Sequence, residues 1–169
     1  MPKKIIYASL ILLALLLQLS FLPMLTAGSM AGDAVLMLVL ALAVLNGFEA
    51  SLKWALVAGF LYDLASYATV GQHMLIFLLV AYGVSFFSRR LSVEVKGTGL
   101  LFLLGFVVLA TFLSTILTAG FSVFSIAGGL KFLPQAFGSF SFFLLQTICN
   151  LGLLLFWYQI LRKLNRIFL

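Results

Sequence analysis

Charged residues are scarce in this sequence. They make up 8% of the chain, whereas soluble domains carry roughly 25%, and hydrophobic residues make up 64%. The few charges are mostly basic, with ten Lys and Arg against four Asp and Glu. The net charge of +6 does not indicate nucleic-acid binding, because the basic residues lie between apolar runs and form no continuous basic face. The composition is that of an integral membrane protein, and 169 residues correspond to one domain.

The sequence also lacks the residues from which most catalytic and metal sites are built. Its single cysteine, Cys149, excludes an intramolecular disulfide. Its single histidine, His73, has no second histidine and no cysteine or acid at the spacing of metal ligands. The sequence shows no glycine-rich phosphate loop, no paired carboxylates and no nucleophile with a base and an orienting acid. We therefore expect no enzymatic activity, no cofactor and no metal.

The apolar residues fall into segments that match membrane spans, each of which needs about 20 apolar residues. The sequence predicts helices over residues 5–22, 33–46, 50–68, 72–88, 99–119 and 139–161. Asp33 is expected to cap the second helix, and Asn46-Gly47 to end it. A cleavable signal peptide is the alternative for the first segment, but its apolar run is longer than the 7–15 residues usual for such peptides.

Residues 120–138, between the last two predicted helices, are interrupted by Gly128-Gly129, Lys131 and Pro134. Backbone this irregular is tolerated at membrane depth only where protein shelters it, so this segment is predicted to be an interfacial or re-entrant loop.

The distribution of basic residues predicts the orientation of the chain. If the N-terminus is cytoplasmic and six helices follow, nine basic residues lie at inner ends and only Lys131 lies outside, as the positive-inside rule requires. The nine are Lys3, Lys4, Lys53, Arg89, Arg90, Lys96, Arg162, Lys163 and Arg166. The predicted fold is an all-α integral membrane protein, a single domain over residues 1–169 formed by a six-transmembrane-helix bundle, with N- and C-termini cytoplasmic.

The third predicted helix carries small and polar residues at four-residue spacing: Ser51, Ala55, Gly59, Asp63 and Tyr67. Residues at this spacing share one face of a helix, and small residues there let another helix approach closely in lipid. An acid on the same face is shielded from acyl chains. Ala55, Gly59 and Asp63 are therefore candidates for helix packing or partner contact. For Asp63, a structural hydrogen bond, a partner contact and ion coupling remain open.

Four more residues complete the set of packing or partner-contact candidates. His73 is expected to fix the Gly71–His73 turn against Asp63, and Gly71 fits a turn that requires positive φ or close backbone approach. Gln146 and Asn150 lie one turn apart on the last predicted helix and are expected to form a buried amide face that directs helix packing.

The segment from Gly59 to Tyr82, followed by Arg89-Arg90, resembles the rod shape-determining protein MreD family. The resemblance rests on the Gly-x-x-x-Asp-Leu-x-Ser pattern, a glycine-containing turn, and a Leu-rich helix that ends in Ala-Tyr and arginines. It implies a non-enzymatic, multi-pass scaffold of the bacterial cytoplasmic membrane, bound to the single-span protein MreC. It further implies links to peptidoglycan-synthesis enzymes and to the actin-like filament MreB. Besides membrane lipids, a second copy of the chain is a further candidate partner.

Two other function classes remain open. The MreD family is similar to the small-molecule (vitamin-type) binding components of energy-coupling-factor transporters, which dock through an Ala-x-x-x-Ala motif in their first helix. Here Ala8 and Ala14 are six residues apart, so that motif is absent. An ion-coupled carrier is disfavoured because the sequence has one deep acid and no inverted repeat.

Overall fold

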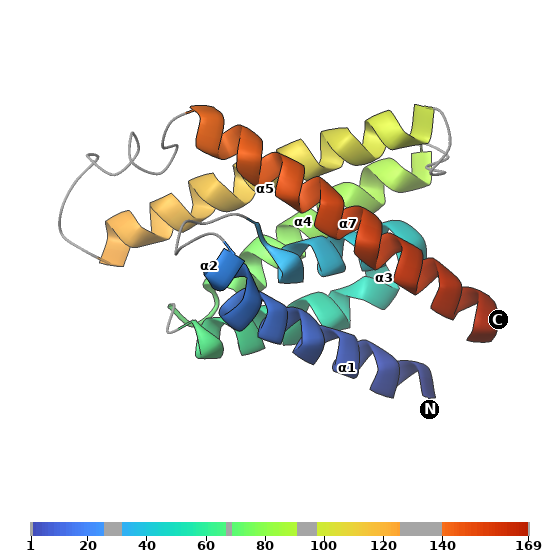
Figure 1. Cartoon of the computed structure of the whole chain (residues 1–169). Coiled ribbons are helices and arrows are strands. Elements are labelled where there is room, and N and C mark those ends of the chain that lie inside the picture. The colour runs from blue at the N-terminus through green and yellow to red at the C-terminus, as the bar shows by residue number, and fades with distance from the viewer. Residues whose placement is uncertain (1, 26–31, 67–68, 91–97, 126–139, 169) are drawn as a thin grey trace.

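The computed structural model describes residues 2–25, 32–66, 69–90, 98–125 and 140–168 (Figure 1). In these ranges the regular structure is all helical, without strands, as the sequence predicts. The elements are α1 (Pro2–Leu16), a π-helical turn η1 (Leu17–Phe21), α2 (Leu22–Leu25), α3 (Ala34–Ala65), α4 (Gln72–Arg90), α5 (Thr98–Ser125) and α7 (Phe140–Phe168). Helix α5 continues to Ser125, past its predicted end at residue 119, and residues 126–138 of the predicted loop lie outside the described ranges.

Four helical stretches in the described ranges are long and apolar enough to cross a membrane: Lys3–Met24, Ala34–Ala65, Leu101–Thr118 and Phe143–Ile167. This number differs from the six spans predicted above for two reasons. Helix α3 contains both the second and the third predicted spans, which are joined at a kink at Gly47, and the apolar part of α4, Gln72–Phe87, is shorter than the other four.

Helix α3 is interrupted at Gly47, whose φ of 76° and ψ of 177° are not helical. An unbroken helix of 32 residues would hold its two ends about 48 Å apart, at 1.5 Å per residue. Asp33, at one end of α3, instead lies close enough to Tyr62, near the other end, for their side chains to interact electrostatically. The chain therefore folds back at Gly47, as Figure 1 shows. We call residues 34–46 the central segment and residues 48–65 the return segment of α3.

The central segment forms the core of the protein. Ten consecutive residues, Ala34 to Ala43, are each at most 1% exposed. A helix buried on every side must be apolar all round, and this stretch contains only Ala, Val, Leu and Met. Helices α1, α4 and α7 pack against α3, and α5 packs against α4 and α7. Large apolar side chains on the outer helices, such as Leu101 and Ile148, are more than 60% exposed, as expected for surfaces that face lipid.

A ring of hydrogen bonds joins three helices at the end of the molecule where both termini lie (Figure 1). The Tyr7 hydroxyl donates to Asn165 Oδ1 at 3.2 Å and accepts from Asn46 Nδ2 at 3.3 Å. Asn165 Nδ2 donates to Asn46 Oδ1 at 3.1 Å. The ring of Trp54 meets Tyr7 edge to face at 5.6 Å. The three hydrogen bonds among Tyr7, Asn46 and Asn165 therefore hold α1 and α7 against the point where α3 folds back.

Replacing Gly47 tests the fold-back of α3. Positive φ combined with ψ near 180° is accessible essentially only to glycine, so Gly47→Ala is expected to cost about 1–3 kcal/mol and to lower the melting temperature in detergent. Gly152 on α7 is the matched control, because a Cβ there meets nothing within 4 Å. Gly152→Ala is expected to leave the melting temperature unchanged or to raise it. If the Gly47→Ala and Gly152→Ala variants had the same melting temperature, the strained backbone geometry at Gly47 would be contradicted.

Candidate functional site

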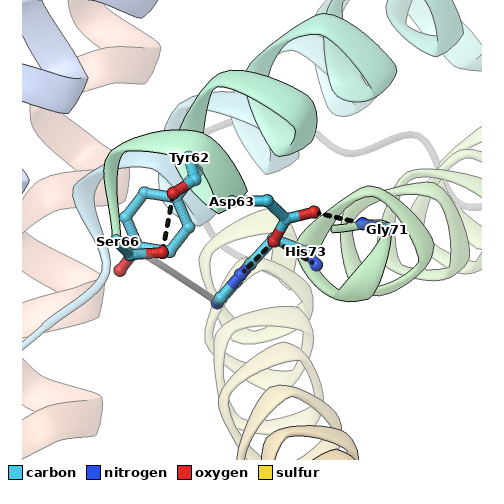
Figure 2. Close-up of polar contacts among 5 residues, drawn as sticks. All are labelled: Tyr62, Asp63, Ser66, Gly71 and His73. Carbon is cyan, nitrogen blue, oxygen red and sulfur yellow. Dashed lines mark hydrogen bonds and ion pairs between the residues drawn. The ribbon is translucent and has the colours of Figure 1, made fainter. Parts of the chain in front are cut away.

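The carboxylate of Asp63 holds the start of helix α4. Its side chain, on the return segment of α3, is fully buried. One oxygen, Oδ2, accepts from the backbone N–H of Gly71 at 2.8 Å, and Oδ1 accepts from the backbone N–H of His73 at 3.0 Å (Figure 2). The first N–H groups of a helix have no partner within it and carry the positive end of its dipole. Asp63 therefore acts as an N-terminal cap that a neighbouring helix supplies.

The imidazole of His73 completes the set of donors around this carboxylate. His73 Nδ1 lies 2.7 Å from Asp63 Oδ1, a geometry in which Nδ1 carries the proton and donates it. Tyr62 meets the His73 ring edge to face at 4.3 Å and stacks on Phe77 at 6.1 Å. Asp33 and Gln18 are also close enough to Tyr62 to interact with it. Tyr62 therefore connects the Asp63–His73 pair to the polar side chains of Asp33 and Gln18 at the same end of the bundle.

The close approach of α3 to α4 depends on Gly59. A Cβ on Gly59 would lie 2.5 Å from the Cα and 2.6 Å from the backbone nitrogen of Met74, so the two backbones are in contact. Ala55, one turn earlier on the same face, is also fully buried. Gly71, which has a φ of +98°, turns the chain into α4. The structure thus brings together Ala55, Gly59, Asp63, Gly71 and His73 at one helix contact.

This arrangement holds the two helices together, and both oxygens of Asp63 accept hydrogen bonds. Every buried side-chain nitrogen or oxygen atom in the described residues has a hydrogen-bond partner. The described residues contain no group of three or more His, Cys, Asp or Glu side chains placed to bind a metal ion. The Asp63 cluster, formed by Asp63, Gly71 and His73, therefore joins α3 to the start of α4 through hydrogen bonds.

A second polar cluster holds the start of the central segment, and the structure separates the two predicted amide residues there. Asn150 is fully buried; its Oδ1 accepts from the Asp33 N–H at 2.7 Å and its Nδ2 donates to Thr111 Oγ1 at 2.8 Å. It thereby joins α3, α5 and α7. Gln146 is only half-buried and makes no hydrogen bond to another described residue. The expected amide face is therefore divided between a buried junction at Asn150 and the Gln146 side chain, which has no hydrogen-bond partner among the described residues.

Sequence reasoning did not single out Gln18, which lies in the π-helical turn η1. Gln18 Oε1 accepts from the Ala34 N–H at 2.7 Å and Nε2 donates to the Gly32 carbonyl at 3.1 Å. The Trp157 indole donates to the Ala34 carbonyl at 3.0 Å. Asp33 caps the helix locally, its Oδ1 accepting from Leu36 N–H at 2.8 Å. The available signal was an amide inside the first apolar run, since polar residues in spans are rare and seldom face lipid.

The chain matches the family of the rod shape-determining protein MreD over residues 3–168. The match confirms the resemblance of residues 59–90 and extends it over nearly the whole chain. No curated protein and no solved structure matches the chain.

The contact at Gly59 predicts that even one added methyl group will separate α3 from α4. Gly59→Ala is expected to cost about 1–3 kcal/mol through overpacking against the Met74 backbone, and to lower the melting temperature in detergent. Gly105 on α5 is the control, because a Cβ there meets nothing within 4 Å. A Gly59→Ala variant that melts no lower than Gly105→Ala would show that the two backbones are not in contact.

The capping role of Asp63 predicts a graded response to substitution. Asparagine keeps one acceptor oxygen but leaves at least one of the three donors without an acceptor, at a cost of about 1–3 kcal/mol. Leucine leaves all three donors unpaired, so Asp63→Leu is expected to melt at a clearly lower temperature than Asp63→Asn. The measurement is thermal unfolding in detergent at matched protein levels. Wild-type melting of Asp63→Leu would refute the cap.

Proposed function

The chain belongs to the rod shape-determining protein MreD family and so has a role in rod shape determination, and we propose that it fulfils this role as a non-enzymatic scaffold. The Asp63 cluster supports a scaffold over an ion-coupled carrier. A carrier needs an acid that exchanges its proton or ion, whereas both oxygens of Asp63 are occupied by donors from the start of α4. The buried carboxylate contributes to the fixed geometry of the bundle.

We propose that this membrane protein crosses the bacterial cytoplasmic membrane six times, with both termini in the cytoplasm. The fold-back at Gly47 supports two crossings within α3, one for each segment. The central segment is only about 20 Å long at 1.5 Å per residue, shorter than the roughly 30 Å hydrocarbon core. Because protein surrounds it, this shortness leaves no polar backbone facing lipid. Lys3, Lys4 and Arg166 are exposed at the end that carries both termini, which supports a cytoplasmic location for that end.

The proposed partner is an MreC-like single-span protein, through which the scaffold reaches cell-wall synthesis enzymes and MreB; a second copy of the chain is a further candidate partner. Transmembrane helices associate through close packing and interhelical hydrogen bonds. Gln146 supports such a contact, because it lies within the candidate span Phe143–Ile167 with an amide that bonds to no described residue. A polar side chain on a partner helix would satisfy this amide.

Affinity purification from native membranes tests the scaffold. The tagged chain is expected to retain an MreC-like single-span protein and to restore rod shape in cells depleted of the native copy. Gln146→Leu is expected to lower the retained partner about threefold, from the roughly 0.6 kcal/mol average of an interhelical hydrogen bond. Gln159→Leu is the control, since Gln159 is an exposed amide on the same helix. Retention of an ATPase pair in place of the single-span protein would refute the scaffold and indicate small-molecule uptake.

A further inference from the structure

Basic residues gather where the first and last helices meet. The hydrogen bond from Tyr7 to Asn165 holds the start of α1 against the end of α7. Lys3 and Lys4 lie one helical turn before Tyr7, and Arg162 and Arg166 lie within one turn of Asn165. All four basic side chains are exposed. We call these four residues the basic corner; it lies at the end where Figure 1 places both termini.

The helical periodicity places the basic corner on the side of each helix where this contact forms. At 3.6 residues per turn, Lys3 and Lys4 point within about 60° of Tyr7 around α1. Arg162 and Arg166 point within about 100° of Asn165 around α7. Lys163, also exposed, points roughly 160° away from Asn165 and about 100° away from Arg162, but only about 60° away from Arg166.

The four charges of the basic corner have no acidic partner among the described residues. The ion pair found in these ranges joins His73 to Asp63. Asp33 and Asp63 belong to the polar clusters at the other end of the bundle, and Glu49 is the one described acid near the fold-back of α3. Four exposed positive charges therefore lie at an end of the bundle that holds one described acid, Glu49, which leaves a local excess of positive charge.

We propose that the basic corner binds the phosphate group of an anionic phospholipid. Arginine pairs with phosphate oxygens through two parallel N–H groups, and lysine adds a point charge. Basic pockets between transmembrane helices on the cytoplasmic side are suited to anionic head groups. Tyr7 and Trp54, in edge-to-face contact beside the corner, place aromatic rings at the level where head groups lie. The assignment to the cytoplasmic leaflet rests on the orientation proposed above.

A lipid bound here would act as a bridge between the two ends of the chain. The polar ring of Tyr7, Asn46 and Asn165 already joins α1, α3 and α7. A phosphate between Lys3 and Lys4 on one side and the arginines on the other would neutralise the repulsion between these helix ends. Anionic lipid is therefore expected to stabilise the docking of α1 against α7.

The test is a lipid titration of the purified full chain in nanodiscs. The disc lipid is phosphatidylcholine with increasing phosphatidylglycerol, and the readouts are the lipid retained, by native mass spectrometry, and the melting temperature. The wild type is expected to retain phosphatidylglycerol in preference and to melt higher in its presence. Arg162→Gln is expected to weaken apparent lipid affinity roughly fivefold, the effect of one basic residue near an anionic surface. Lys3→Gln/Lys4→Gln is expected to weaken it by roughly fivefold for each charge removed.

Lys163→Gln is the matched control, because it removes one exposed charge from the same helix at the same depth. It is expected to retain nearly wild-type lipid affinity. A loss equal to that of Arg162→Gln would show diffuse attraction to the membrane and overturn the site, as would the absence of any preference for phosphatidylglycerol. Equal stabilisation by inorganic phosphate in phosphatidylcholine discs would assign the corner to a free anion and also overturn the proposal. The result does not depend on a protein partner, since only the chain and lipid are present.

Discussion

A helix that starts inside a bilayer cannot give its first N–H groups to water, and this constraint decides where the few polar residues of the protein lie. The Asp63 carboxylate on α3 takes up the first N–H groups of α4. Gln18 and Asn150 take up those at the start of the central segment of α3. In each case the acceptor comes from a different helix, so satisfying a helix end also fixes how two helices pack. An unpaired group at these depths would cost several kcal/mol.

The same constraint explains why the central segment can be short. In the six-crossing arrangement proposed above, a helix of about 20 Å would end below the surface of a roughly 30 Å hydrocarbon core. The side chains of Gln18, Asn150 and Trp157 close this end within the protein, and Asp33 caps it locally. The surrounding helices then keep the ten residues from Ala34 to Ala43 out of contact with lipid. The core is thereby a helix covered by helices, closed at both ends by polar junctions.

These junctions also bear on function. The side chain of Asp63 and the backbone N–H of Asp33 hydrogen-bond to neighbouring parts of the bundle, an arrangement that supports the scaffold proposed above. Its outer faces are apolar, and the basic corner gathers charge where the two chain ends meet.

The sequence by itself determined the features that depend on local spacing. The apolar runs predicted helices, Asp33 was placed to cap the helix that follows it, and four-residue spacing put Ala55, Gly59 and Asp63 on one face. These outcomes depend on residues within one or two turns of each other, which the helical period alone relates. The pairing of Asp63 with His73 was also accessible, because a short turn joins the helices that carry them.

Only the tertiary structure decided which distant helices meet. Gln18 lies in the π-helical turn η1, and its side chain hydrogen-bonds to Ala34 at the start of α3. No spacing in the sequence predicts this contact between η1 and α3. Asn150 and Gln146 have equivalent positions by periodicity, yet Asn150 meets Thr111 and Asp33 while Gln146 meets no described polar group. The sequence predicted a break at Asn46-Gly47, and Gly47 is indeed non-helical, but the way the two segments of α3 then pack was not specified by the sequence. Each of these results depends on packing between segments far apart in the chain, which a one-dimensional pattern does not specify.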